Sequence, residues 1–521
     1  MMTDCRQAKT IQGLPEFFNA AEDLLSENLS KRADRIAVFD HRGNCTYAEL
    51  GDRIARMAGV FEALNVKRDQ RVLLCLTDTR DFPTVFLGAI RAGVVPVPLN
   101  TLLTEEDYHW ILRNSGAVAV FVSSELAGKW LPFVDSEPHV RFVSSEGGAW
   151  PNLEALLNES SPAEMAAKTH RDDVAFWLYT SGSTGKPKGA MHLHGSMRLT
   201  ANLYGQGIAG YRESDVVLSI AKQFFAYGLG NALTFPYAAG ASVVLFNGRA
   251  TPEAISDLVR QHKVTVLGAV PTFLAGWLAH PSCPTGEESP QLRIITSAGE
   301  ALPVHLGRAF ADRFGTEVLD GLGSTEMLHI FVSQRPGAVR YGCTGQVVDG
   351  YKVRLIDDEG NECGPDEIGN LQVCGPTTAI GYWRNRPKSI ESFQGEWTVT
   401  GDKYVMDEDG WLTYSGRADD MLKVGGIYVS PIEVEEALAS HSDVLESAVV
   451  GARDSDNLVK PHAYVVLHNN VELGDALKDA LKTHVKEVLA PYKYPRWISF
   501  VDELPKTATG KIQRFRLRDE A

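Results

Sequence analysis

The most informative segment is Tyr179-Thr180-Ser181-Gly182-Ser183-Thr184-Gly185-Lys186-Pro187-Lys188-Gly189. It combines three glycines, four serine or threonine hydroxyls and two lysines. The apolar run Val174-Ala-Phe-Trp-Leu-Tyr179 directly before it is typical of a buried strand. A strand that ends in such a loop presents backbone N–H groups, hydroxyl donors and ammonium charge to one small volume. The segment therefore predicts a site for a polyphosphate.

The spacing of this segment differs from that of a Walker A loop. Pro187 stands five residues after Gly182, and Ala190 stands five residues after Gly185, where the GxxxxGK[ST] pattern requires glycine. The segment therefore predicts that ATP binds outside the P-loop NTPase fold.

The whole chain is a large and acidic globular protein. Its 521 residues exceed what one hydrophobic core normally organises, so we expect two or more domains. A hydrophobic content of 44% and a charged content of 22% are ordinary for globular proteins. The net charge of −15 argues against nucleic acid or an anionic membrane as the main partner.

Cysteine usage and the N-terminal residues predict a cytoplasmic location. The seven cysteines are scattered and show no CxxC spacing, which favours a reducing compartment and no zinc site. The N-terminus has no apolar signal region, and no apolar run of 18 residues occurs. His192 and His194 are spaced like a metal pair on a strand, but no cysteine or acidic cluster accompanies them.

Strand-like and helical patterns alternate from residue 71 to about residue 325. Thr104-Glu-Glu-Asp107 and Thr251-Pro252 have the composition of helix starts. Such alternation predicts mostly parallel sheets covered on both faces, with ligands beyond the carboxyl ends of the strands, where we also expect the 180–189 loop.

The pattern changes after residue 340. Two strand-like runs at 351–356 and 369–374 enclose a turn-forming segment, which predicts antiparallel β structure. A second boundary falls at Gly416-Arg-Ala-Asp-Asp420, and an α+β pattern follows it.

Five further segments carry groups that suit a nucleotide. Ser297-Ala-Gly-Glu300 and Asp320-Gly-Leu-Gly-Ser-Thr-Glu326 each follow a strand-like run, and Glu326 offers oxygen for Mg²⁺. The others are Thr400-Gly-Asp402, Gly416–Asp420 and the Lys511 segment near the C-terminus. Taken singly, they are more typical of turns, surface ion pairs or a solvated tail.

The order of these segments resembles the adenylate-forming superfamily of acyl-CoA synthetases, adenylation domains and luciferases, along essentially the whole chain. Within it, the segments Phe86–Pro98, Ala221–Asn231 and Gly323–Phe331 resemble the benzoate–CoA ligase branch. The superfamily commonly has a Phe-His pair in the 221–228 segment, whereas this chain has Phe224-Phe225. That departure agrees with the aryl branch and argues against a fatty-acyl enzyme.

The resemblance implies an α/β fold with two domains. The large N-terminal domain, residues 1–418, should contain parallel-rich sheets flanked by helices and a distorted β-barrel subdomain at about 340–415. A small, mobile α+β domain, residues 419–521, should carry the catalytic lysine.

The resemblance also implies roles for individual residues with ATP, CoA and Mg²⁺. Lys511 would bridge the carboxylate and the α-phosphate, Thr325 would contact that phosphate, and Glu326 would hold Mg²⁺. The remaining roles are the phosphate loop (Thr180, Ser181, Gly182, Ser183, Thr184, Gly185 and Lys186), the adenine frame (Ser297, Gly299, Glu300, Asp320 and Gly321), the ribose contacts (Asp402 and Arg417), the acid pocket (Phe225, Ala226, Tyr227, Gly228, His329 and Ile330), the hinge (Asp419) and the CoA loop (Lys423, Gly425 and Gly426).

The implied activity is ATP-dependent benzoate–CoA ligation through an acyl-adenylate, with rotation of the C-terminal domain between half-reactions. Three alternatives stay open: a ligase for 2-aminobenzoate or hydroxybenzoate, an adenylation enzyme that loads a carrier protein, and a nucleotide sensor. The short tail after Lys511 favours free CoA, and the intact Lys511, Glu326, Asp402 and Arg417 argue against a sensor. For His329, a bond to a ring substituent or water and support of Glu326 are equally plausible.

Two partner hypotheses concern the whole chain and its tail. A homodimer is one candidate assembly. Lys511 also resembles the exposed lysines that acetyltransferases silence in acyl-CoA synthetases, because acetylation removes the charge that the chemistry requires.

Overall fold

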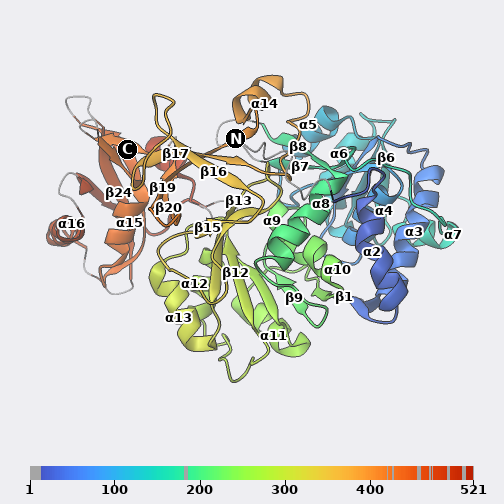
Figure 1. Ribbon diagram of the computed structural model, residues 1–521, viewed down its shortest axis with the longest axis horizontal. Coiled ribbons are helices and arrows are strands. Elements are labelled where there is room, and N and C mark those ends of the chain that lie inside the picture. The colour runs from blue at the N-terminus through green and yellow to red at the C-terminus, as the bar shows by residue number, and fades with distance from the viewer. Residues whose placement is uncertain are drawn as a thin grey trace. The chain divides into compact units, whose positions relative to one another are not determined.

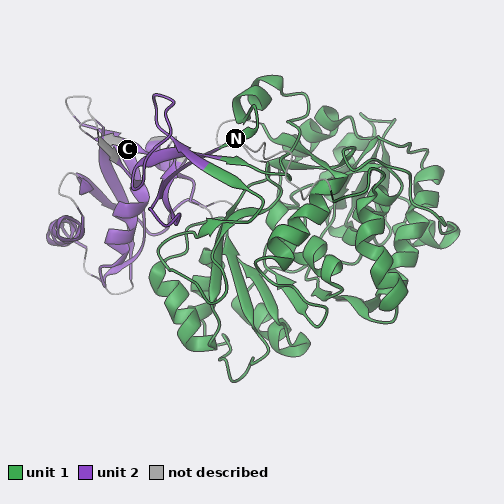
Figure 2. Ribbon diagram, in the orientation of Figure 1, with its two compact units in different colours: residues 1–353, 373–399 green, residues 354–372, 400–521 purple. Residues whose placement is uncertain are grey.

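The computed structural model describes residues 13–148, 150–180, 186–418, 420–424, 427–454, 459–468, 471, 473–489, 493–506 and 512–519. Its contacts divide the chain into two compact units (Figure 2). Unit 1 comprises residues 1–353 and 373–399, and unit 2 comprises residues 354–372 and 400–521. The domain boundary expected at 418/419 differs from this division and stays a prediction.

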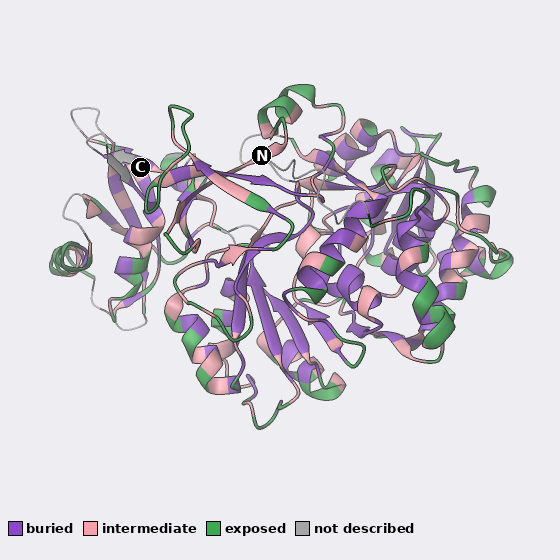
Figure 3. Ribbon diagram, in the orientation of Figure 1, coloured by how far each residue is buried: buried purple, intermediate pink, exposed green. Residues whose placement is uncertain are grey.

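A four-stranded parallel sheet lies in the N-terminal part of unit 1 (Figure 1). Its order is β4 (Val95–Pro98), β3 (Arg71–Cys75), β5 (Ala119–Val122) and β6 (Arg141–Ser144). The flanking helices include α3 (Tyr47–Ala63), α4 (Asp81–Arg91) and α5 (Glu105–Ser115). Thr104 caps α5 by accepting a hydrogen bond from the Asp107 amide, as the sequence predicts. All of α4 is buried, which fits its apolar composition (Figure 3).

The second sheet of unit 1 has nine strands. Its order is β15 (Gln346–Val347), β14 (Ile330–Ser333), β13 (Val318–Gly323), β12 (Ile294–Ala298), β11 (Val266–Ala269), β9 (Val216–Ser219), β10 (Ser242–Val244), β1 (Ile36–Asp40) and β2 (Gly43–Thr46). The strands from β13 to β1 pair in parallel, and the strands at both edges pair in antiparallel fashion. Helices α11 (Pro252–His262), α12 (Pro271–Ala279) and α13 (Val304–Phe314) lie near it (Figure 1). The predicted parallel-rich α/β architecture is confirmed.

The strand predicted at 174–179 exists, but its expected setting was wrong. β7 (Val174–Thr180) pairs in antiparallel fashion with β8 (Lys188–Leu193), so this strand belongs to an antiparallel pair and not to a parallel sheet. The side chains of β7 pack into two hydrophobic clusters, with Phe176 in one and Trp177 in the other. An apolar run indicates that a strand is buried on both faces, but it does not indicate whether the neighbouring strand is parallel or antiparallel.

The remaining elements of unit 1 connect these sheets. They are α2 (Ala20–Lys31), the 3-10 turn Ser124–Lys129, α6 (Leu131–Val134), α7 (Leu153–Glu159), α8 (His194–Thr200), the π-helical segments Ala201–Gln206 and Gly230–Thr234, α9 (Ala226–Leu229), α10 (Phe235–Ala239) and α14 (Arg386–Ser392).

A five-stranded sheet forms the β-rich region that the sequence predicts. It contains β16 (Lys352–Ile356), β17 (Ile368–Cys374), β18 (Phe393–Gln394), β19 (Trp397–Met406) and β20 (Leu412–Arg417). The predicted turn is present: the Asp357 carbonyl accepts from the Gly360 amide, and Gly360 has φ of +92°. Such a backbone favours glycine.

The C-terminal part of unit 2 has the predicted α+β pattern. β23 (Val444–Arg453), β24 (Val459–Leu467) and β25 (Trp497–Phe500) form one sheet, against which α15 (Pro431–Ala439) and α16 (Asp475–Val488) pack. β21 (Leu422–Val424), β22 (Ile427–Val429) and α17 (Arg514–Asp519) complete the unit. Across the described part of the chain, no helix combines the length and the apolar character that a membrane crossing requires.

Candidate functional site

The two segments predicted to frame adenine lie next to each other. β12 and β13 are adjacent and parallel, with Ser297 opposite Asp320 and Ala298 opposite Gly321. Gly299 follows with φ of +92°, a conformation that a side chain disfavours. Parallel strands present ligand sites at their carboxyl ends, so this register places both segments at one edge of the sheet.

Asp320 carries its carboxyl group in a buried position on this edge. Burial raises the pKa of Asp320 to about 8, and nearby Ser297 and the amides of Gly321 and Leu302 offset only part of that effect. At neutral pH the group is therefore mostly the uncharged acid. Among the described residues, Asp320 Oδ1 and Ser297 Oγ have no hydrogen-bond partner. Two buried polar atoms without partners suit the polar edge of a ligand.

The Glu300 carboxylate binds the start of helix α12. Its Oε2 accepts hydrogen bonds from the Thr272 amide at 3.2 Å and from Thr272 Oγ1 at 2.7 Å, at the start of α12. A carboxylate stabilises the N-terminus of a helix, so this side chain has a structural task.

Two glycines of β13 allow close approach of the returning strand β14. A Cβ atom on Gly321 would lie 2.9 Å from Ile330 Cγ2, and one on Gly323 would lie 2.6 Å from the His329 carbonyl oxygen. Ile330 is paired opposite Gly323. These glycines therefore bring the predicted acid-pocket residues His329 and Ile330 against the predicted nucleotide segment.

The 225–230 segment contacts β12, one of the two strands that end in the predicted adenine frame. Phe225 precedes α9, and a Cβ atom on Gly228 would lie 2.0 Å from the Lys222 carbonyl oxygen. Tyr227 Oη shares a hydrogen bond of 2.8 Å with Thr296 Oγ1 on β12. The predicted pocket segment is therefore anchored next to the predicted adenine frame. Phe225 and Ala226 are partly buried against the core.

His329 lies among aromatic rings. Its ring centroid is 5.5 Å from that of Tyr227, 5.1 Å from that of Tyr204 and 4.5 Å from that of Phe235. Burial lowers the pKa of His329 to about 3, so the imidazole is neutral at physiological pH. Nε2 donates to the Tyr227 carbonyl oxygen at 3.3 Å in the tautomer that this acceptor requires. Nδ1 is buried and has no hydrogen-bond partner among the described residues.

The hairpin that carries the phosphate-loop residues is only partly described. Thr180 and Lys188 pair at the ends of β7 and β8. Lys186 is exposed, and its Nζ lies 2.5 Å from Glu106 Oε1. Ser181, Gly182, Ser183, Thr184 and Gly185 lie outside the described residues.

Glu326 is half-buried and has one partner that sequence reasoning missed. Tyr382 Oη donates to Glu326 Oε1 at 2.6 Å, while Glu326 Oε2 makes no hydrogen bond to a described residue. Tyr382 lies between a glycine and a tryptophan, and no sequence pattern connects it with Glu326. Within the described ranges, no three histidine, cysteine or acidic side chains gather as metal ligands. Thr325 lies beside Glu326 and is half-buried.

The two predicted ribose residues meet within unit 2. Asp402 and Arg417 pair across β19 and β20, and Arg417 Nη1 lies 3.0 Å from Asp402 Oδ1. The arginine also donates to the Thr400 carbonyl oxygen at 3.3 Å. Both side chains are thereby held at one edge of this small sheet.

The predicted catalytic lysine, the predicted hinge and most of the predicted CoA loop are not described. Lys511, Asp419, Gly425 and Gly426 lie outside the described residues. Lys423 lies in β21 and pairs with Tyr428 of β22.

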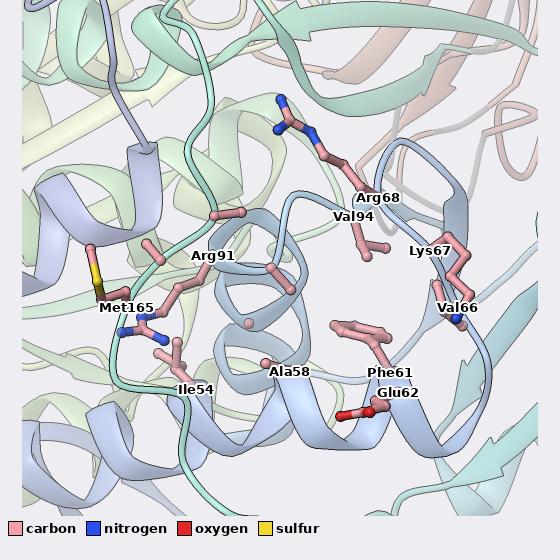
Figure 4. Close-up of a pocket in the computed structure, with 14 residues that line it drawn as sticks. Ile54, Ala58, Phe61, Glu62, Val66, Lys67, Arg68, Arg91, Val94 and Met165 are labelled. Carbon is pink, nitrogen blue, oxygen red and sulfur yellow. The ribbon is translucent and has the colours of Figure 1, made fainter.

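A separate depression lies in unit 1 and contains none of the predicted site residues. Its lining includes Ile54, Phe61, Arg91, Val94 and Met165 (Figure 4). Arg91 is already engaged there, because it binds Glu22 and the carbonyl oxygens of residues 163 and 164. The predicted residues at the ends of β12 and β13 are therefore the better candidate site.

Comparison with known proteins gives one consistent result. The profile described as AMP-binding enzyme matches residues 25–383, and the profile described as AMP-binding enzyme C-terminal domain matches residues 433–511. A benzoate–CoA ligase from Thauera aromatica is 52% identical over 97% of this chain and 96% of its own length. A crystal structure of a benzoate CoA ligase from Burkholderia xenovorans is 48% identical, with a TM-score of 0.90 over 96% of this chain and all of that one. An anthranilate CoA ligase bound to anthranoyl-AMP is 39% identical, with a TM-score of 0.93 over 98% of both chains.

Proposed function

The chain belongs to the AMP-binding enzyme family, in its benzoate–CoA ligase branch, and from this premise we propose that it joins benzoate to CoA using ATP. The products are benzoyl-CoA, AMP and diphosphate. The observation that carries the proposal is the 52% identity to a benzoate–CoA ligase along nearly the whole chain. The aromatic surroundings of His329 and Tyr227 support an aryl acid.

The first half-reaction makes the carboxyl group reactive. A carboxylate oxygen attacks the α-phosphorus of ATP, and the bond from that phosphorus to the bridging oxygen breaks, which releases diphosphate and leaves benzoyl-AMP. Two anions must meet, so hydrogen-bond donors and cations aimed at the developing charge should supply most of the catalysis. We assign the loop 180–186 to the β- and γ-phosphates, and Thr325 and Lys511 to the α-phosphate.

Mg²⁺ is the metal that these groups fit. Glu326 has one carboxylate oxygen bound to Tyr382 and a second without a hydrogen bond to a described residue. Mg²⁺ typically uses one or two protein carboxylates together with substrate phosphates and water, so a single acidic side chain suffices. Glu326 would hold the metal, which neutralises phosphate charge when bound.

The nucleoside is assigned to two groups of residues. Ser297, Gly299, Asp320 and Gly321 would surround adenine, where the uncharged acid of Asp320 offers both a donor and an acceptor. Glu300 would contribute through its backbone, because its side chain caps α12. Asp402 and Arg417 would bind the ribose hydroxyls and a phosphate oxygen.

The acid pocket is assigned to Phe225, Ala226, Tyr227, Gly228, His329 and Ile330. Flat apolar walls suit an aromatic ring, and the absence of a side chain at Gly228 lets this segment pack directly against the Lys222 backbone. A neutral His329 places no charge against the ring.

One observation favours a second candidate, a 2-aminobenzoate or hydroxybenzoate ligase. His329 Nδ1 is a buried acceptor without a partner among the described residues, and an amino or hydroxyl substituent could donate to it. A site built to bond such a group discriminates strongly against acids that lack it, whereas an apolar pocket discriminates only weakly. Relative rates for benzoate and 2-aminobenzoate therefore separate the two candidates.

The second half-reaction forms the thioester. The CoA thiolate attacks the acyl carbon, and the bond from that carbon to the AMP oxygen breaks. We assign this step to a second arrangement of the C-terminal domain, reached by rotation about Asp419, which would bring Lys423, Gly425 and Gly426 to the carbonyl. Silencing by acetylation at Lys511, a homodimer and a cytoplasmic location stay predictions.

A coupled AMP-release assay tests the proposed function. Purified enzyme receives ATP, Mg²⁺ and CoA with benzoate, 2-aminobenzoate, 4-hydroxybenzoate, phenylacetate or octanoate. We expect the highest kcat/KM with benzoate and no turnover of octanoate. Turnover of octanoate above that of benzoate would refute the aryl assignment, and AMP release independent of CoA but dependent on a carrier protein would support the loading alternative.

A further inference from the structure

A short segment links the phosphate hairpin to Glu326. Residues 379–383 run along the free side of β8, where the Met191 amide donates to the Gly381 carbonyl at 3.1 Å and the Ile380 amide to the Met191 carbonyl at 3.0 Å. The Trp383 amide donates to the Gly189 carbonyl at 2.9 Å. The segment therefore acts as a third strand on the hairpin that carries the phosphate loop.

The same segment holds the backbone of Glu326. The Ala379 amide donates to the Glu326 carbonyl oxygen at 2.7 Å. Thr377 Oγ1 donates to the Met327 carbonyl oxygen at 2.7 Å. Two hydrogen bonds thus fix the main chain on which the Glu326 side chain is mounted.

Tyr382 is the residue that reaches the Glu326 carboxylate. Its phenol donates to Oε1 at 2.6 Å, which is the length of a hydrogen bond to an ionised acceptor. Tyr382 is only 5% exposed, and its ring centroid lies 5.3 Å from that of Phe393. The Tyr382 amide donates to Ser389 Oγ at 2.9 Å. Side chain and backbone are therefore both held in place.

A cation from the phosphate hairpin completes the contact. Lys188 Nζ lies 4.7 Å from the centroid of the Tyr382 ring, on the face of the aromatic system. Lys188, Tyr382 and Glu326 therefore form a continuous series of contacts in the folded chain.

We propose that Tyr382 is a positioning residue that orients the Glu326 carboxylate for Mg²⁺. By occupying Oε1, the phenol fixes the rotation of the carboxylate and leaves Oε2 for the metal. The 379–383 segment makes this orientation depend on the phosphate hairpin, so the metal ligand and the polyphosphate site are aligned together. The inference rests on the proposed function, in which Glu326 holds Mg²⁺.

The test compares two phenol deletions. Tyr382→Phe keeps the ring, its packing and its contact with Lys188, and removes the phenol's hydrogen bond to Glu326 together with its longer contact of 3.5 Å to Ser392 Oγ. Tyr47→Phe is the matched control, because Tyr47 is also buried and its phenol donates a hydrogen bond of 2.6 Å to the Ala241 carbonyl oxygen, a contact that involves neither Glu326 nor the 379–383 segment. Near-UV circular dichroism confirms that both variants fold.

The direct readout is metal binding without turnover. Electron paramagnetic resonance measures the Mn²⁺ affinity of each protein in complex with α,β-methylene-ATP, whose α–β linkage the enzyme cannot break. Loss of a group that orients a metal ligand typically weakens metal binding by about 10–100-fold. We expect that loss in Tyr382→Phe and less than about 3-fold in Tyr47→Phe. The Mg²⁺ concentration for half-maximal ATP–diphosphate exchange should rise in parallel.

A double-mutant comparison separates positioning from a general structural effect. In a Glu326→Gln background, Tyr382→Phe should cause no further loss of Mn²⁺ affinity, because the carboxylate that it orients is gone. Equal Mn²⁺ affinities for Tyr382→Phe and wild type, or equal losses in both phenol variants, would overturn the inference. Because α,β-methylene-ATP binds without an acid, these outcomes remain readable even if wild type fails to activate benzoate.

Discussion

Asp320→Asn should change how the stability of the enzyme depends on pH. The Asp320 carboxyl is buried, and its native pKa of about 8 compares with 3.8 for an exposed aspartate. Between these values the native state holds a proton that the unfolded state has lost. Stability from this group is therefore complete below pH 3.8 and falls as pH rises toward 8.

The size of the effect follows from the two pKa values. One bound proton changes the free energy of unfolding by about 1.4 kcal/mol per pH unit. Integrated from pH 5 to pH 8, wild type should lose about 3–4 kcal/mol through Asp320 alone. Asparagine cannot ionise, so the stability of Asp320→Asn relative to wild type should rise by that amount over the same range.

Two measurements check this prediction. Unfolding midpoints of wild type and Asp320→Asn, recorded together from pH 5 to pH 8.5, give the difference directly. Infrared spectroscopy should also show a carboxylic-acid C=O band at pH 6.5 in wild type that vanishes near pH 9 and is absent from the variant. Parallel midpoints across this range, together with no such band, would refute the argument that burial keeps Asp320 protonated.

Three further predictions concern the acid pocket, the tail and buried histidines. Gly230→Ala places a Cβ atom 2.3 Å from His329 Cδ2. We therefore expect the KM for benzoate to rise at least ~10-fold, while the ATP affinity measured by calorimetry stays unchanged. Equal weakening of benzoate and ATP binding would contradict a local effect. Lys511→Ala should slow benzoate-dependent ATP–diphosphate exchange at least ~100-fold and leave thioester formation from synthetic benzoyl-AMP largely intact, whereas unchanged exchange would remove Lys511 from the mechanism. Burial lowers the pKa of His192 and His194 to about 4 and that of His329 to about 3. As pH falls below about 6.5 the unfolded state binds protons that the folded state does not, so these histidines reduce the free energy of unfolding. The thermal midpoint should therefore fall less between pH 7 and pH 5 in His192→Gln, which lacks one such group, than in wild type.

Local sequence predicted the parts of this fold whose causes are local. The apolar run at Val174 forms β7, Thr104 caps α5, and Thr251-Pro252 begins α11, because burial, capping and proline geometry act within a few residues. The sequence did not determine the partner of β7. Its apolar side chains suit a parallel or an antiparallel neighbour equally, and the structure has the antiparallel one.

The candidate site likewise has features that the sequence predicted and features that it did not. Ser297 and Asp320 belong to motifs that the sequence singled out, and the strand register brings them opposite each other. Tyr382 was missed because its partner Glu326 lies 56 residues away, and the contact exists only after the 379–383 segment has joined β8. The neutral state of Asp320 was equally invisible, since it depends on burial and not on residue type.

The fate of a carboxylate oxygen tests the acyl-adenylate mechanism most directly. Benzoate labelled with ¹⁸O in both carboxylate positions is converted with ATP and CoA, and the products are analysed by mass spectrometry. Attack of the carboxylate on the α-phosphorus predicts one ¹⁸O atom in each AMP and none in diphosphate. Unlabelled AMP, or label in a released phosphate, would contradict the central account.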